Sequence, residues 1–166
     1  MTSSPAAPQA IQPRLLRVPA LAPLLTVEAV RAALSYTEDE VIFDLEDGTL
    51  AWAWNIASSD AQRREVRVFA PCVEQRRAWL ENPKWRVKTF AAADVEAALF
   101  PSRGGKPFVT STDLRLALCC SADLVIDLID AGELRLVEGT SYSAGRTGGA
   151  VVTWASVVKF LKDRRI

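Results

Sequence analysis

Apolar residues recur at helical spacing through Val30 to Leu34, and this pattern predicts an α-helix. After a short break, Thr37 and Glu40 have the spacing of a capping box, in which each residue satisfies a free backbone N–H of the other at the start of a helix. A second apolar face follows and stops at Gly48, which can end a helix in the left-handed conformation. We therefore expect a helix, a tight turn and a second helix.

Strand-like alternation replaces the helical period after this pair. Residues 50–54 and 65–69 alternate between apolar and polar positions on either side of a turn at 58–60, which predicts a β-hairpin. Pro71 then favours the first turn of a helix that runs to about Leu80.

The same pattern occurs a second time. It predicts helices at 110–118 and 121–132, a strand at 134–137, a glycine-rich loop at 138–149, a returning strand at 151–154 and a helix at about 156–164. An offset of 84 positions relates Thr26 to Thr110, Val30 to Leu114, Leu34 to Leu118, Val41 to Val125, Leu45 to Ile129, Gly48 to Gly132 and Leu50 to Leu134. Phe69 and Trp154 differ by 85, which predicts one extra residue in the second hairpin. The chain therefore contains an internal repeat.

The segments outside the two copies complete the expected organisation. Residues 85–90 predict a strand, residues 91–100 a helix, and residues 101–107 a linker. We divide the chain into a disordered Pro/Ala-rich arm (1–23), a first unit (24–82), a connector and linker (83–107) and a second unit (108–166). The expected fold class is mainly α with small β-hairpins, that is α+β.

Each copy resembles the winged helix-turn-helix, in the compact MerR-like form of excisionases. In the first copy the resemblance is carried by residues 25–28, Leu34, Thr37, Val41, Leu45, Gly48-Thr49-Leu50 and 66–68. In the second it is carried by Val109-Thr110, Leu114, Leu118, Ser121, Val125, Leu128-Ile129, Gly132-Glu133-Leu134 and 157–161. The resemblance implies two tandem DNA-binding units in a transcriptional regulator or in an excisionase-like accessory factor of a mobile element.

Composition points away from an enzyme. The 166 residues include no histidine, and no glycine-rich phosphate-binding loop is present, so we expect neither catalysis nor a cofactor. The three cysteines, Cys72, Cys119 and Cys120, lack the spacing of a zinc site and are expected to be reduced in a cytoplasmic protein. No apolar run reaches the roughly 20 residues that span a bilayer, and the first residues do not resemble a secretory signal.

Charge qualifies the expected DNA binding. In the winged helix-turn-helix proteins that the copies resemble, the second helix is the one that enters the major groove. Residues 37–47 nevertheless hold six carboxylates and no cation, and residues 121–131 hold three carboxylates and no cation. Residues 26–60 have a net charge of −7 and residues 61–88 a net charge of +5. We therefore expect the hairpins and the final helix to contact phosphates without much reading of bases. The candidate contacts are Arg63, Arg64, Arg67, Arg146, Lys159, Lys162, Arg164 and Arg165.

The alternative is a protein-interaction module, such as a phage assembly adaptor, because the fold also resembles that of some terminase small subunits. An acidic helix would then face a basic partner or a second copy in a homodimer. Its candidate residues are Glu38, Asp39, Glu40, Ile42, Phe43 and Asp44. This alternative predicts that the arginines of the hairpin and last helix pair with residues 38–47, and that Ile42 and Phe43 are covered by another chain. In either case Trp52 and Trp54 share one strand face, which we expect to be packed.

Overall fold

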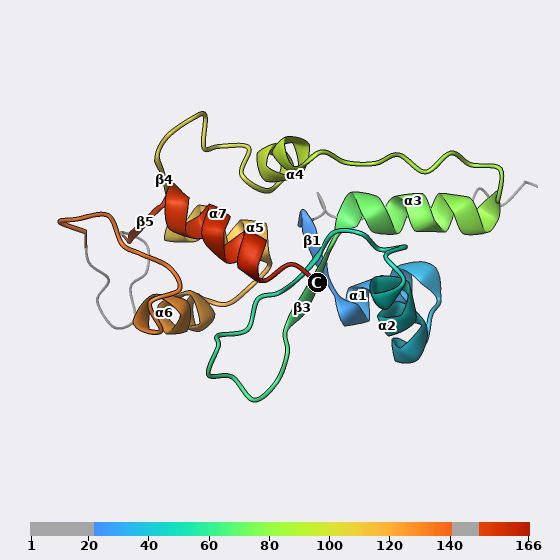
Figure 1. Ribbon diagram of the computed structural model, residues 1–166, viewed down its shortest axis with the longest axis horizontal. Helices are drawn as coiled ribbons and strands as arrows, with labels where there is room; N and C mark the ends of the chain where they lie inside the picture. Colours follow the sequence, from blue (N-terminus) through green and yellow to red (C-terminus); the bar gives the residue numbers. More distant parts are fainter. Residues whose placement is uncertain (1–21, 141–149) are drawn as a thin grey trace, which may run out of the picture.

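The computed structural model describes residues 22–140 and 150–166 (Figure 1). The predicted arm at 1–23 lies almost wholly outside these residues. The described part contains the helices α1 (Val27–Leu34), α2 (Glu38–Glu46), α3 (Ala70–Glu81), α4 (Ala92–Leu99), α5 (Ser111–Leu118), α6 (Ala122–Asp130) and α7 (Trp154–Asp163). Its strands are β1 (Leu24–Thr26), β2 (Ala53–Asn55), β3 (Val66–Phe69), β4 (Phe108–Thr110) and β5 (Val151–Thr153). The α+β class is confirmed, while membership of the winged helix-turn-helix family stays a prediction.

The internal repeat is present in the backbone. Helices α5 and α6 begin and end 84 positions after α1 and α2. Thr26 and Thr110 cap the first helix of each copy with their side-chain oxygens. Gly48 and Gly132 close the second helix of each copy at φ 79° and 73°, in the left-handed region that favours glycine. The helix boundaries predicted from caps and glycine stops are therefore confirmed.

The offset of 84 continues into the last helix. The backbone N–H of Ala70 donates to the carbonyl of Pro23, and the N–H of Trp154 donates to the carbonyl of Pro107 in the same way. Trp154 thus corresponds to Ala70, and the match of Trp154 with Phe69 at an offset of 85 is wrong. Helix α7 accordingly begins at Trp154, two residues before the predicted start.

The second hairpin does contain an extra residue. One more position separates the bridged residues Leu136 and Val152 than separates the paired residues Ala53 and Val68. The second copy has one residue fewer than the first between Gly132 and Leu136. This deletion balances the extra residue of the hairpin, so the offset is again 84 at Val68 and Val152. The predicted strand at 134–137 is reduced to this single bridge, because the following chain turns away after Val137.

The predicted strand at 85–90 is wrong. This segment is irregular, and in Figure 1 it runs back alongside α3. Trp85 and Val87 are 50% and 61% exposed, so the apolar side chains of the alternating pattern face solvent. No described strand lies beside this segment to pair with it. Only Phe90 packs inward, with its ring edge-on to Phe69 at 5.4 Å between centroids. The helix predicted at 91–100 is confirmed as α4.

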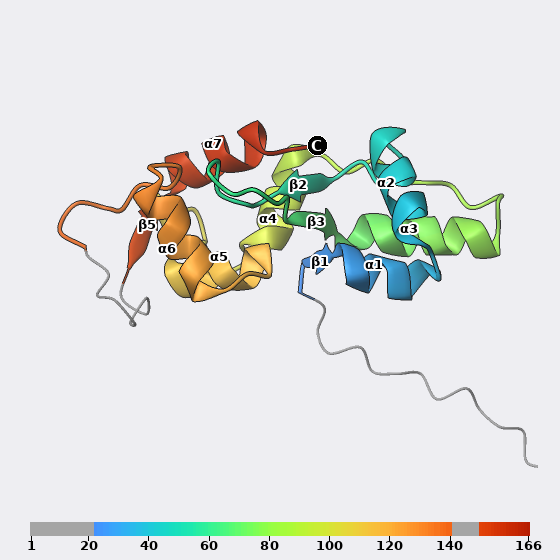
Figure 2. The same cartoon turned by 90° about the horizontal axis from the view of Figure 1, so that it is seen from below.

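The two copies share one core. The first sheet has the order β1-β3-β2 and lies between α1–α3 on one side and α5–α7 on the other (Figures 1 and 2). The chain after α7 extends that sheet, since the N–H of Asn55 donates to the Arg164 carbonyl and the N–H of Ile166 donates to the Ala53 carbonyl. Helix α4 adds its buried apolar side chains to the core and brings Phe100 edge-on to Trp154 at 5.2 Å. The second copy therefore completes the sheet of the first.

Candidate nucleic-acid interface

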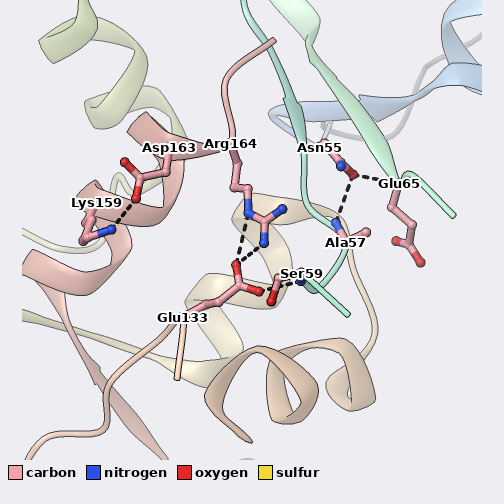
Figure 3. Close-up of polar contacts among 8 residues, drawn as sticks. All are labelled: Asn55, Ala57, Ser59, Glu65, Glu133, Lys159, Asp163 and Arg164. Atoms are coloured by element: carbon pink, nitrogen blue, oxygen red, sulfur yellow. Dashed lines mark hydrogen bonds and ion pairs between the residues drawn. The ribbon is translucent and has the colours of Figure 1, made fainter. Parts of the chain in front are cut away.

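A groove of about 750 Å³ lies between the loop of the first hairpin and α7. The hairpin contributes Ser59, the chain after α6 contributes Glu133 and Arg135, and Lys159 and Arg164 come from α7 and its carboxyl end. Figure 3 shows the polar contacts of this neighbourhood. Positive side chains of the second copy thus lie beside the loop of the first hairpin, at a surface that we call the hairpin–α7 groove.

Glu133 fixes the shape of this groove. Its Oε1 accepts the Ser59 backbone N–H at 2.7 Å, and its Oε2 accepts from Arg164 Nε at 3.1 Å (Figure 3). Burial alone raises the pKa of Glu133, but the bonds from Ser59 and Arg164 outweigh it and hold the pKa below its usual value. Within the hairpin, the Asn55 side-chain oxygen accepts the N–H groups of Ala57 and Glu65. The loop is therefore held against the second copy.

Three of the predicted phosphate contacts are exposed and have no ion-pair partner among the described residues. Arg63 and Arg64 lie on the loop of the first hairpin, and Lys162 lies on α7. Lys159 is paired with Asp163, but their side chains are 76% and 51% exposed, so water screens this pair. A phosphate can replace such a partner at little cost. Arg146 lies outside the described residues.

The other three predicted contacts are bound to partners within the protein, and two of them join the copies. Arg67 is half-buried and donates through Nε to the Cys119 carbonyl at 3.1 Å, which joins β3 to the end of α5. Arg164 is bound to Glu133, and both side chains are at most one-fifth exposed. Arg165 lies 3.6 Å from the centroid of the Trp52 ring and donates to the Ala51 carbonyl. These partners lie outside α2, so these three arginines do not pair with residues 38–47 within the chain, and pairing with a second copy stays a prediction.

Sequence reasoning missed Arg135. This residue is exposed and lines the hairpin–α7 groove. Its neighbour Leu134 is buried and Leu136 is half-buried, so the alternation of this segment already placed Arg135 on the opposite side. The alternation therefore predicts an outward-facing Arg135, but it does not show that the first hairpin and α7 lie close to this residue.

The second helices present acidic surfaces. On α2, Ile42 and Phe43 are 42% and 65% exposed, among the exposed carboxylates of Glu38, Asp39 and Glu46, and we call this surface the α2 face. Glu40 forms the predicted capping box with Thr37, whose hydrogen bonds hold the pKa of Glu40 below its usual value. On α6, Asp123 and Asp127 are exposed. Such surfaces repel a phosphate backbone.

Asp44 does not belong to the α2 face, although we grouped it there from the sequence. It is 2% exposed and accepts two hydrogen bonds from Arg76 of α3, at 2.8 and 3.0 Å. Arg76 also donates to the Tyr36 hydroxyl and lies over the Trp79 ring. Burial lowers the pKa of Arg76, but Tyr36 and Asp44 together raise it above its usual value. The offset of 84 places Leu128 and Phe160 at the equivalent positions, so an ion pair here replaces an apolar pair.

The packing expected for the tryptophans is confirmed. Trp54 is 2% exposed and Trp52 is half-buried, with 5.9 Å between their ring centroids. Trp54 is therefore closed to a base, and Arg165 covers one face of the Trp52 ring.

Across residues 22–140 and 150–166, no helix combines the length and the apolar character needed to cross a membrane. In the same residues no three acidic or cysteine side chains gather closely enough to hold a metal ion.

Comparison with models of known protein families, with curated proteins and with solved structures gave no match to this chain.

Proposed function

We propose that this protein is a non-enzymatic DNA-binding accessory factor that contacts the phosphate backbone through the hairpin–α7 groove. The observation that carries the proposal is that the loop of the first hairpin, which holds two exposed arginines, borders a groove lined by exposed cations of the second copy. Arg135 and Lys159 line the groove, Lys162 is exposed on α7, and Arg63 and Arg64 are exposed on the hairpin loop that contributes Ser59 to the groove.

This mode of binding needs no helix in the major groove. The carboxylates of α2 and α6 would be repelled by the phosphates that border the major groove, so we expect neither helix to enter it. Contacts to phosphate position a protein on DNA and carry little sequence information. The expected binding is therefore weakly sequence-selective and depends steeply on salt.

Titration against random-sequence duplex DNA at several salt concentrations tests the proposal. Each phosphate contact contributes a slope of about −0.9 to the dependence of log K on log salt. Replacing Arg63 and Arg64 with alanine should therefore make the slope shallower by about 2 and weaken binding. Arg31→Ala is the matched control, because Arg31 is exposed at the end of α1 and away from the groove.

Two outcomes of the titration would overturn the proposed DNA binding through the hairpin–α7 groove. One is the absence of binding at low salt. The other is a loss of binding with Lys84→Ala and Arg86→Ala but not with Arg63→Ala and Arg64→Ala, which would move the contact to the exposed segment after α3.

The α2 face favours protein interaction as a second candidate function. Burying Phe43 at an interface would contribute about 1.5–3 kcal/mol, and the surrounding carboxylates would select a basic partner or a second copy. Sedimentation of the wild type and of Phe43→Lys tests the homodimer. A dimer that Phe43→Lys dissociates supports it, and a wild-type monomer at high concentration excludes the second copy as the partner.

A further inference from the structure

A second cavity shares no lining residue with the hairpin–α7 groove. It measures about 570 Å³, which is within the range of small-molecule sites in proteins, roughly 300–1,000 Å³. Helix α3 forms one wall, the chain from Gly48 to Trp52 forms another, and residues 87–90 form a third. Arg165 lies at the edge where the chain after α7 joins the first sheet.

The lining of this cavity combines aromatic rings with positive charge. Trp52, Trp79 and Phe90 supply apolar surface. Arg76, Lys88 and Arg165 supply positive charge, and none of the described lining residues is acidic. Because Asp44 neutralises Arg76, the charge left for a ligand comes from Lys88 and Arg165.

Several contacts hold these walls in place without a ligand. The guanidinium of Arg165 is fixed over Trp52 and bonded to the Ala51 carbonyl. The backbone N–H of Lys88 donates to the Gln75 side-chain oxygen of α3, which ties residues 87–90 to the helix. The Lys88 side chain remains exposed. A site that is already formed loses less entropy when a ligand binds.

We propose that this cavity binds a small planar aromatic anion, with its ring against the tryptophans and its charged group at Lys88 and Arg165. The apolar lining provides affinity for the ring by excluding water from both surfaces. The cations select an acid over a neutral molecule of the same shape, because a charge-assisted hydrogen bond is stronger than a neutral one.

Calorimetric titration of the full chain with 2-naphthoate and with neutral 2-naphthylmethanol tests this proposal. We expect saturable binding of 2-naphthoate, and binding weaker by about tenfold for the alcohol, which corresponds to one charge-assisted hydrogen bond. Lys88→Met should weaken 2-naphthoate binding several-fold and leave the alcohol unaffected. Lys106→Met is the matched control, because Lys106 is exposed in the 101–107 segment and does not line the cavity.

Ala51→Phe supplies an independent variant, since it adds volume at the cavity wall and removes no charge. We expect it to abolish binding of both probes while the melting temperature stays near that of the wild type. The proposal is overturned if 2-naphthoate does not bind saturably, if the alcohol binds as tightly as the acid, or if Lys88→Met and Lys106→Met behave alike.

Discussion

Replacing Asp44 and Arg76 with the residues found at the equivalent positions of the second copy tests the repeat as a physical correspondence. The variants are Asp44→Leu, Arg76→Phe and the double variant. If the copies pack alike, the double variant gives the first copy the apolar pair that the second copy has at Leu128 and Phe160. Each single variant instead leaves one charge without its partner.

The structure sets the size of these effects. The Asp44 side chain is 3% exposed and the Arg76 side chain 19%, so neither charge can be fully hydrated when its partner is lost. Breaking such a pair costs about 3–5 kcal/mol, and we expect the lower end because Arg76 keeps Tyr36 and some water. A loss of about 3 kcal/mol lowers the melting temperature of a chain of this size by about 6–12 °C. The double variant should lie within about 1 kcal/mol of the wild type.

Urea unfolding of the wild type and the three variants gives the coupling energy directly. We expect a coupling of at least about 3 kcal/mol in favour of the double variant. Arg77→Leu is the control, because its pair with Glu81 is about two-thirds exposed on both sides and contributes about 0.5 kcal/mol or less. Single variants as stable as the control, or a double variant as unstable as the sum of the singles, would refute the correspondence.

Three further predictions concern other positions. Glu133→Gln should destabilise the protein at neutral pH, and its difference from the wild type should shrink as pH falls through the lowered folded-state pKa of Glu133, below the usual 4.5, as acid unfolding curves can show. Gly48→Ala should cost about 1 kcal/mol in urea unfolding because its φ is positive, although its added methyl meets no neighbour; an unchanged midpoint would contradict this. Burial raises the pKa of the Cys72 and Cys120 thiols to about 11, so both should react slowly with a disulfide reagent at pH 8 until the protein unfolds.

The sequence predicts elements whose signals are local. The caps at Thr26 and Ser121 and the stops at Gly48 and Gly132 fix helix boundaries because the donors and acceptors that they satisfy lie within a few residues. The segment at 85–90 shows the limit of such patterns. Its alternation resembles a strand, but a strand also needs a neighbour with free backbone groups, which no local pattern specifies.

The candidate interface depends on tertiary contacts in the same way. Arg63 lies in the hairpin loop and is exposed, whereas Arg67 lies in β3 and reaches the Cys119 carbonyl, a partner 52 positions away that no local pattern specifies. The pairing of Asp44 with Arg76 could have been inferred, because both positions depart together from the apolar residues 84 positions later. Arg135 could be placed on an outward face, but not beside the first hairpin.

The hydrogen bonds between residues 164–166 and β2 can form only after the end of the second copy has been synthesised. The partner residues 53–55 leave the ribosome long before residues 164–166 are made, so the edge of the first sheet stays open while the second copy is translated. Contacts of such long sequence separation form slowly, because a large loop must close before they stabilise anything. An open strand edge is also a template for pairing with another chain. The nascent protein is therefore most prone to aggregate during this interval, and the arrival of its last strand-like segment ends that exposure.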